Sequence, residues 1–255
     1  MIVALIDSGL GLLPTSAWLR RLRPELDLVL SLDPDGAPWG PKPEQWVVER
    51  VSEAAQRSLD RGARVIVLPC NTASVTALSQ VRELVGPDIP VVGTVPAVKP
   101  AAAACDSVAI WATAATTASR YQADLIAQFA GESSVVGVAC HGLADAIDLG
   151  DRAAALAAID AAVERTPRGV GGVVLGCTHY PLLAKDIAAR LPPGVQLFDS
   201  AEAVARQTLR RIDALGVDTG RGVGSVEVFV SGRPGVLPRS AEAFEAGRTL
   251  GAVQV

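Results

Sequence analysis

Short apolar runs that alternate with helical patterns constrain the fold of this chain most strongly. Most runs are rich in Val, Ile and Leu without polar alternation, which is typical of strands buried on both faces of a parallel sheet. The runs lie at 2–6, 26–32, 65–68, 91–92, 108–111, 135–139, 173–175, 195–198 and 226–230. Helical patterns lie at 43–61, 72–85, 117–130, 151–165, 181–191, 200–215 and near 240–248. This spacing predicts an α/β fold with right-handed crossovers.

An internal repeat divides the chain into two parts of similar plan. Asp7 ends the first predicted strand and precedes Cys70 by 63 residues, while Thr113 precedes Cys177 by 64. The next strand ends 26 residues after Asp7 in one part and 26 residues after Thr113 in the other. Because four strand positions have nearly the same spacing in both parts, a duplication of one α/β segment is favoured, although α/β units of ordinary length can produce part of this agreement. We therefore predict two pseudo-symmetric open α/β lobes, each with a parallel sheet, that face a central cleft.

The carboxyl ends of the strands are the expected place for a ligand, because open parallel sheets bind ligands there. The residues predicted at or near these ends are Asp7, Asp33, Cys70, Thr94, Thr113, Cys140, Cys177 and Asp199.

Cys70 and Cys177 occupy equivalent strand ends, and each is expected to begin a turn into a helix, where free backbone N–H groups favour an anion. A buried cysteine is by default a small hydrophobic residue. The polar neighbours of both, in CNT and CTH, favour a functional interpretation. Two opposed thiols suit the inversion of a carbon stereocentre, since one removes a proton from one face and the other delivers a proton to the opposite face.

The carbanion of such a reaction needs stabilisation, and the sequence favours a cofactor-independent solution. Pyridoxal phosphate would need a Schiff-base lysine, and none of the three lysines lies in a convincing cofactor motif. N–H donors and hydroxyls at helix starts can instead hold a substrate carboxylate. The candidates are Ser8, Asn71, Thr72, Thr116 and Thr178, although plain N-capping explains any one of them equally well.

Two further side chains can tune the thiols. Asp7 is placed to assist Cys70, and His179 is placed to assist Cys177. His141 is as consistent with a partly buried structural histidine as with a functional one. No ligand-pair spacing favours a metal site, and Pro14 stands where a dinucleotide-binding loop needs a glycine.

Composition excludes several classes of protein. The formal net charge of −4 gives no support to nucleic-acid binding, and no apolar segment is long and unbroken enough to predict a membrane span. The four isolated cysteines and the lack of a recognisable signal peptide predict a cytoplasmic protein.

Several motifs together resemble the cofactor-independent glutamate racemases of the aspartate/glutamate racemase superfamily. The motifs follow the family order along essentially the whole chain, and the two that contain Cys70 and Cys177 are the specific ones. They are DSG at 7–9, PWGPK at 38–42, CNTAS at 70–74, GTVPA at 93–97, TAAT at 113–116, GCTHYP at 176–181 and DSA at 199–201.

The resemblance implies interconversion of L- and D-glutamate, which supplies D-glutamate for peptidoglycan. It makes Cys70 and Cys177 the acid/base residues, assisted by Asp7 and His179. It also implies an amino-acid substrate, no cofactor, a homodimer of variable mode, and lobes of 1–97 with 208–255 and 98–207. The residues that would hold the substrate are Ser8, Pro38, Trp39, Gly40, Asn71, Thr72, Thr116 and Thr178.

Departures from the family pattern leave the substrate side chain open. Leu12 replaces a glycine, Trp39 replaces a tyrosine, and the segment 139–150 places His141 at a proline position and Asp148 at a glutamate position. The alternatives are a related racemase or isomerase that acts on aspartate or another acid, and a non-catalytic protein that binds a partner, as relatives that inhibit DNA gyrase do. A cysteine hydrolase would not explain the second cysteine.

Overall fold

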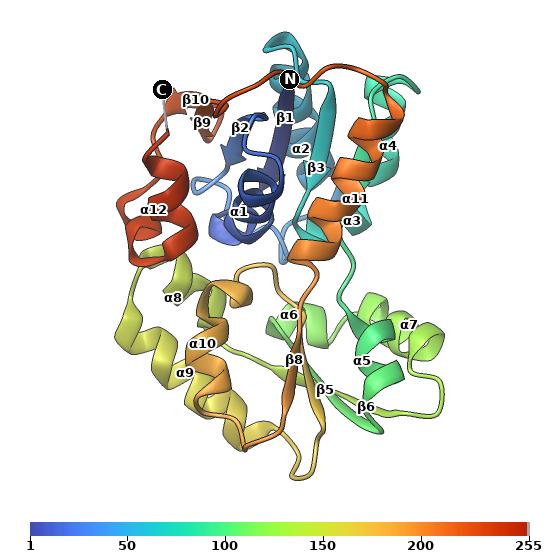
Figure 1. Cartoon of the computed structure of the whole chain (residues 1–255). Coiled ribbons are helices and arrows are strands. Elements are labelled where there is room, and N and C mark those ends of the chain that lie inside the picture. The colour runs from blue at the N-terminus through green and yellow to red at the C-terminus, as the bar shows by residue number, and fades with distance from the viewer. Residues whose placement is uncertain (254–255) are drawn as a thin grey trace. The chain divides into compact units, whose positions relative to one another are not determined.

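The computed structural model describes residues 1–253 and divides the chain into two compact units (Figure 1). Unit 1 contains Met1–Thr94 and the chain from Ala201 onward, and unit 2 contains Val95–Ser200. Helix α11 (Ala201–Ala214) lies wholly in unit 1, where it contacts α1 (Leu13–Leu22) and the strands β3 and β4. The lobes predicted from the sequence, 1–97 with 208–255 and 98–207, would divide this helix.

Unit 1 contains a six-stranded sheet in the order β10-β9-β2-β1-β3-β4. All neighbouring strands are parallel except β10, which pairs antiparallel with β9. The strands are β1 (Ile2–Asp7), β2 (Asp27–Leu32), β3 (Val65–Leu68), β4 (Val91–Gly93), β9 (Val226–Val230) and β10 (Arg233–Gly235).

Two groups of helices pack on this sheet. One group contains α2 (Glu44–Asp60), α3 (Asn71–Thr76) and α4 (Leu78–Val85), which contact one another. The other contains α1, α11 and α12 (Glu245–Gly251), together with the 3₁₀ turns η1 (Leu10–Leu12) and η3 (Arg239–Ala243).

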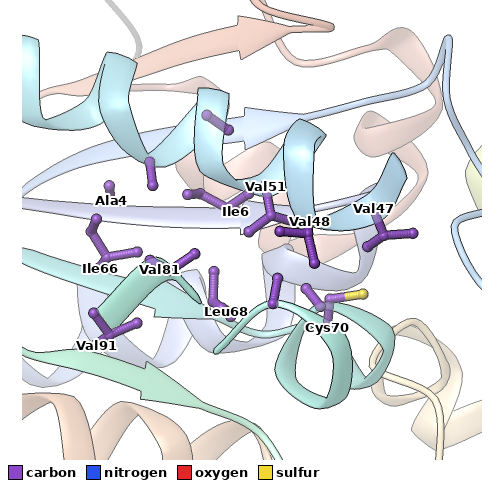
Figure 2. Close-up of a cluster of buried hydrophobic side chains, with 14 of the residues drawn as sticks. Ala4, Ile6, Val47, Val48, Val51, Ile66, Leu68, Cys70, Val81 and Val91 are labelled. Carbon is purple, nitrogen blue, oxygen red and sulfur yellow. The ribbon is translucent and has the colours of Figure 1, made fainter. Parts of the chain in front are cut away.

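The core under α2 shows why this helix forms where it does. Val47, Val48 and Val51 recur on one face of the helix and lie over Ile6 and Ile66 of the sheet (Figure 2). Each of these side chains is at most 9% exposed. Burial of an aliphatic side chain of this size contributes about 1.5–3 kcal/mol, so this face holds the helix to the sheet.

Unit 2 contains a four-stranded, fully parallel sheet in the order β6-β5-β7-β8. Its strands are β5 (Ser107–Ala112), β6 (Ser134–Ala139), β7 (Gly172–Leu175) and β8 (Gln196–Phe198). The order matches β2-β1-β3-β4 of unit 1 strand for strand. This match confirms the α/β class and the repeat predicted from the sequence.

The helices of unit 2 also fall into two groups. Helix α5 (Val98–Ala104) contacts α7 (Arg120–Phe129), and its residues Val98 and Ala101 pack with Val108, Ile110 and Val174 of the sheet. Helix α8 (Leu143–Leu149) contacts α9 (Arg152–Arg165), which in turn contacts β6. The remaining short elements are α6 (Ala114–Thr117), η2 (Tyr180–Leu183) and α10 (Ala184–Ala188).

Several predicted helices differ from the observed ones. The pattern at 72–85 is two helices, α3 and α4, which meet at Ala77. The Thr76 hydroxyl donates to the Thr72 carbonyl at 2.8 Å, a bond that competes with regular helical pairing near this break. The pattern at 181–191 is a 3₁₀ turn followed by the short α10. Within residues 1–253, no helix has the length and apolar character to cross a membrane.

Candidate active site

Three chemically active residues of unit 1 follow neighbouring strands. Asp7 is the last residue of β1, which lies between β2 and β3 in the sheet. Asp33 comes directly after β2, and Cys70 comes two residues after β3. Because the three strands are parallel, their carboxyl ends meet at one edge of the sheet, as the sequence predicts.

Cys70 is held at this edge by its own backbone and by Ser74. It is the N-cap residue of α3 in an extended conformation, and its carbonyl accepts the Ser74 N–H at 2.9 Å. The Ser74 hydroxyl donates to the Leu68 carbonyl at 2.9 Å and accepts the Thr94 N–H at 2.9 Å, which joins β3 to the residue after β4. Figure 2 shows the Cys70 sulfur at the end of the core cluster, beyond Leu68. The thiol is buried, with a 6% exposed fraction.

Asp7 is fully buried, at 0% exposure. The Ser8 N–H donates to its Oδ1 at 2.6 Å, and the Ser8 hydroxyl lies 3.2 Å from the same oxygen. Both polar groups of Ser8 thus lie against the Asp7 carboxylate, and the substrate role of Ser8 stays a prediction. Asp7 also lines a small cavity of unit 1 together with Asp33, Trp39 and Arg50.

The other predicted substrate residues of unit 1 fall on two segments. Trp39 is buried, while its neighbours Pro38 and Gly40 are exposed. Its indole N–H donates to Asp33 Oδ2 at 2.9 Å. Asn71 and Thr72 are half-buried in the first turn of α3, directly after Cys70. Their peptide N–H groups are at the start of a helix, where they can donate to an anion.

Cys177 of unit 2 has the position that corresponds to Cys70, two residues after β7. It begins a turn, as predicted, and this turn leads first into the 3₁₀ turn η2, for which His179 is the N-cap residue, and then into α10. Pro181 favours this short turn. Cys177 and Thr178 are half-buried.

His179 lies between a thiol and a carboxylate. Its Nδ1 is 3.6 Å from Cys177 Sγ, and its Nε2 is 3.1 Å from each carboxylate oxygen of Asp148. Burial by itself would lower the pKa of His179, but the Asp148 carboxylate and the Cys177 sulfur outweigh burial and hold this pKa well above its ordinary value. Cys177, His179 and Asp148 thus form a thiol–imidazole–carboxylate series that can take up and release protons.

Cys140, another cysteine of unit 2, has the surroundings of an unreactive thiol. Burial raises the pKa of Cys140 to about 12, and its thiol donates to the Val138 carbonyl at 3.6 Å. Such a thiol stays protonated at neutral pH and behaves as a structural residue. His141 is exposed, which corrects the reading of it as a partly buried histidine.

Thr113 and Thr116 form a local pair at the end of β5. The Thr113 hydroxyl accepts the Thr116 N–H at 3.3 Å and lies 3.0 Å from the Thr116 hydroxyl. Thr113 therefore caps α6. Thr116, the residue predicted to hold the substrate, is half-buried.

Asp148 and Asp33, whose contacts with His179 and Trp39 are described above, lie outside the set of site residues predicted from the sequence. Asp148 stands out in the sequence only as a departure from the family pattern, and Asp33 stands out only as a strand end. The signal that could find Asp148 is its family position, where a glutamate near the second cysteine is usual. Nothing in the sequence links Asp33 to Trp39, because a bond between two side chains across a turn has no characteristic spacing.

The chain is similar to known proteins over most of its length. The model of the Asp/Glu/Hydantoin racemase family matches residues 22–208. The chain is 37% identical over 240 residues to a glutamate racemase of Pseudomonas putida, which covers 92% of this chain and 90% of that protein. It is 36% identical over 251 residues to the glutamate racemase of Herpetosiphon aurantiacus, covering 95% of this chain and 97% of that protein.

A solved structure is also similar over nearly the whole chain. It is Escherichia coli glutamate racemase in complex with L-glutamate and the activator UDP-MurNAc-ala. The TM-score is 0.82 at 32% sequence identity, and the match covers 99% of this chain and 96% of that one.

Proposed function

The chain belongs to the Asp/Glu/Hydantoin racemase family, and we propose that it is a glutamate racemase that interconverts L- and D-glutamate without a cofactor. The observation that carries this proposal is the pair of cysteines at corresponding strand ends of two sheets with the same strand order. The identity of 35–38% to glutamate racemases supports glutamate as the substrate.

The proposed reaction uses the two thiols as a base and an acid. The thiolate of one cysteine takes the α-proton, and the electron pair of the broken C–H bond stays on the α-carbon. The thiol of the other cysteine then gives its proton to the opposite face of that carbon, which inverts the centre. The reverse reaction exchanges the two roles, so Cys70 and Cys177 serve one direction each as base.

His179 and Asp7 assist the two cysteines in this scheme. His179, held by Asp148, lies beside the Cys177 sulfur and can balance the charge of its thiolate. Asp7 ends the strand next to β3 and is proposed to act on the Cys70 side. The residues proposed to hold the carboxylates of the substrate by N–H groups and hydroxyls are Ser8, Asn71, Thr72, Thr116, Thr178 and the segment 38–40.

The wider setting of the proposal is the supply of D-glutamate for peptidoglycan. The four free cysteines of the chain fit a reducing cytoplasm. A homodimer of the kind common among relatives is part of the proposal.

The proposal is tested by circular dichroism of L-glutamate and, separately, L-aspartate incubated with the purified chain. We expect loss of optical activity with glutamate and not with aspartate. Cys70→Ser and Cys177→Ser should each lower kcat/KM by about 10³-fold or more, because a hydroxyl is a far weaker acid than a thiol.

The matched control is Cys105→Ser, which removes a half-buried free thiol from the same protein and should leave the rate within twofold. If the chain racemised aspartate and not glutamate, the choice of glutamate as the substrate would be wrong. An inert wild-type chain, or full activity in either site variant, would overturn the two-thiol proposal.

A further inference from the structure

Asp33 joins two side chains that are separate in the sequence. Its Oδ2 accepts the Trp39 indole N–H at 2.9 Å and the Arg50 Nε–H at 3.0 Å, and its Oδ1 accepts a second Arg50 hydrogen bond. The Asp33 side chain is buried, and the Arg50 side chain is 30% exposed. Burial would raise the pKa of Asp33, but the hydrogen bonds from Arg50 and Trp39 outweigh it and lower this pKa. The carboxylate is therefore ionised at neutral pH and can hold both donors.

The indole that Asp33 holds is the anchor of an otherwise exposed segment. Trp39 is 2% exposed, whereas Pro38 and Gly40 on either side are exposed. The Ala37 N–H donates to the Asp33 carbonyl at 2.9 Å, and the Lys42 N–H donates to the Trp39 carbonyl at 3.0 Å. The conformation of 37–42 is thus set by the place of the Trp39 indole.

Arg50 reaches the far end of the same segment through Trp46. The guanidinium carbon of Arg50 and the Nζ of Lys42 are each 5.5 Å from the centre of the Trp46 ring. Each contact is in the range of a cation–π interaction. The Asp33 network, defined as Asp33, Trp39, Trp46 and Arg50, therefore fixes 37–42 at both of its ends.

The turn that carries Asp33 is supported from the far end of the chain. The Ser231 N–H donates to the Leu32 carbonyl at 2.8 Å, and the Ser231 hydroxyl accepts the Asp35 N–H at 3.0 Å. The turn also packs closely at Gly36, where an added Cβ atom would overlap the Asp33 carboxylate and the Trp46 ring. The carboxylate is therefore held from several sides.

The Asp33 network lies close to Asp7, the residue proposed to assist Cys70. Asp33, Trp39 and Arg50 line the same small cavity as Asp7. A displaced indole would disturb first the 38–40 backbone that it anchors.

We propose that Asp33, held by Arg50, is a positioning residue that fixes the Trp39 indole and thereby presents the 38–40 segment to the substrate. This inference rests on the proposed function, in which 38–40 holds part of glutamate. Asp33 acts only through Trp39, so it affects the binding of substrate more than the proton transfers. The indole N–H is the only hydrogen-bond donor of the Trp39 side chain, and it is committed to Asp33.

The test is a double-mutant cycle with Asp33→Asn and Trp39→Phe, read as kcat and KM for both glutamate enantiomers. We expect each single variant to raise KM by tenfold or more with kcat within about threefold, and the double variant to be no worse than the poorer single variant. Trp39→Phe keeps an aromatic side chain at this position but removes the indole N–H together with part of the ring system, and it remains informative if Asp33→Asn folds poorly.

The matched control is Glu227→Gln, because Arg61 holds Glu227 of the same sheet by a similar two-bond fork, with Nε to Oε2 at 3.0 Å. Its KM should stay within twofold of the wild-type value. The ¹⁵N–¹H signal of the Trp39 indole, assigned by its loss in Trp39→Phe, should move in Asp33→Asn and not in Glu227→Gln.

Two failures are distinguishable. A wild-type chain that does not racemise glutamate would contradict the proposed function. An active wild type with additive effects in the double variant, an unchanged KM in Asp33→Asn, or an unmoved indole signal overturns the positioning role alone.

Discussion

His179 owes its raised pKa to Asp148, which is 31 positions away in the sequence. Because the pKa is raised in the folded chain, folding favours the protonated imidazole. The resulting stabilisation is fully present below the ordinary histidine pKa of about 6.5 and is lost as the pH rises through the raised value. The interaction thus stabilises the fold most on the acidic side.

Asp148→Asn should lower the pKa of His179, because the amide removes the charge that opposes desolvation. The ring-proton NMR titration measures this directly, since the chain has only two histidines and His141→Gln assigns the second signal. Asp145→Asn, on the same helix α8 and exposed to solvent, is the control and should leave the His179 titration in place. An Asp148→Asn protein whose His179 titrates as in the wild type would contradict the assignment of Asp148.

Sequence reasoning reached some of these residues and missed others for physical reasons. Cys177 and His179 are two residues apart after a buried run, so their proximity follows from local chain geometry. Asp148 comes from a different helix, and its contact with His179 depends on how α8 packs against η2. Asp33 could be placed at a strand end, but the bond from Trp39 to its carboxylate is a feature of the folded turn.

Among the elements, strands were more predictable than short helices. The nine apolar runs all correspond to strands, and most of these strands are buried, as continuous apolar sequence predicts; β6 and β8 are the more exposed ones. Helix α5 begins with Val98-Lys99-Pro100, and its proline is tolerated only because it lies in the first turn. Helix α1 lacks a side-chain N-cap, and α8 starts and ends at glycines with positive φ. Neither therefore begins at the usual side-chain N-cap.

Gly176, between β7 and Cys177, has no room for a side chain. An added Cβ would lie 2.9 Å from the Trp111 carbonyl oxygen and 2.9 Å from Ile110 Cγ2, both on the neighbouring strand β5. Gly176→Ala should therefore push Cys177 out of place, lower the racemisation rate by tenfold or more, and cost about 1–3 kcal/mol of stability.

Urea unfolding and the racemisation rate together check this prediction for Gly176→Ala. Gly251→Ala is the matched control, since an added Cβ there meets nothing within 4 Å. If Gly176→Ala matched this control in stability and activity, the tight fit of Gly176 beside β5 would be refuted.

At the scale of the whole molecule, the repeat seen in the sequence is a repeat of strand order. The spacings of 63 and 64 residues correspond to β1 through β3 in unit 1 and β5 through β7 in unit 2. The return of the chain to the first unit was expected from residue 208, whereas unit 1 resumes at Ala201, the first residue of α11. Each unit contributes one cysteine with its own polar neighbours, and the proposed reaction uses both.

The α-proton exchange of L- and D-glutamate in D₂O tests most directly whether each cysteine serves one face of the α-carbon. Followed by ¹H NMR, Cys70→Ser and Cys177→Ser should both fail to invert glutamate. Each should still exchange the α-proton of one enantiomer, with the opposite enantiomer in the two variants, because the remaining thiol serves one face only. Exchange of the same enantiomer by both variants, or inversion at the wild-type rate by either, would contradict a mechanism with one thiol for each face.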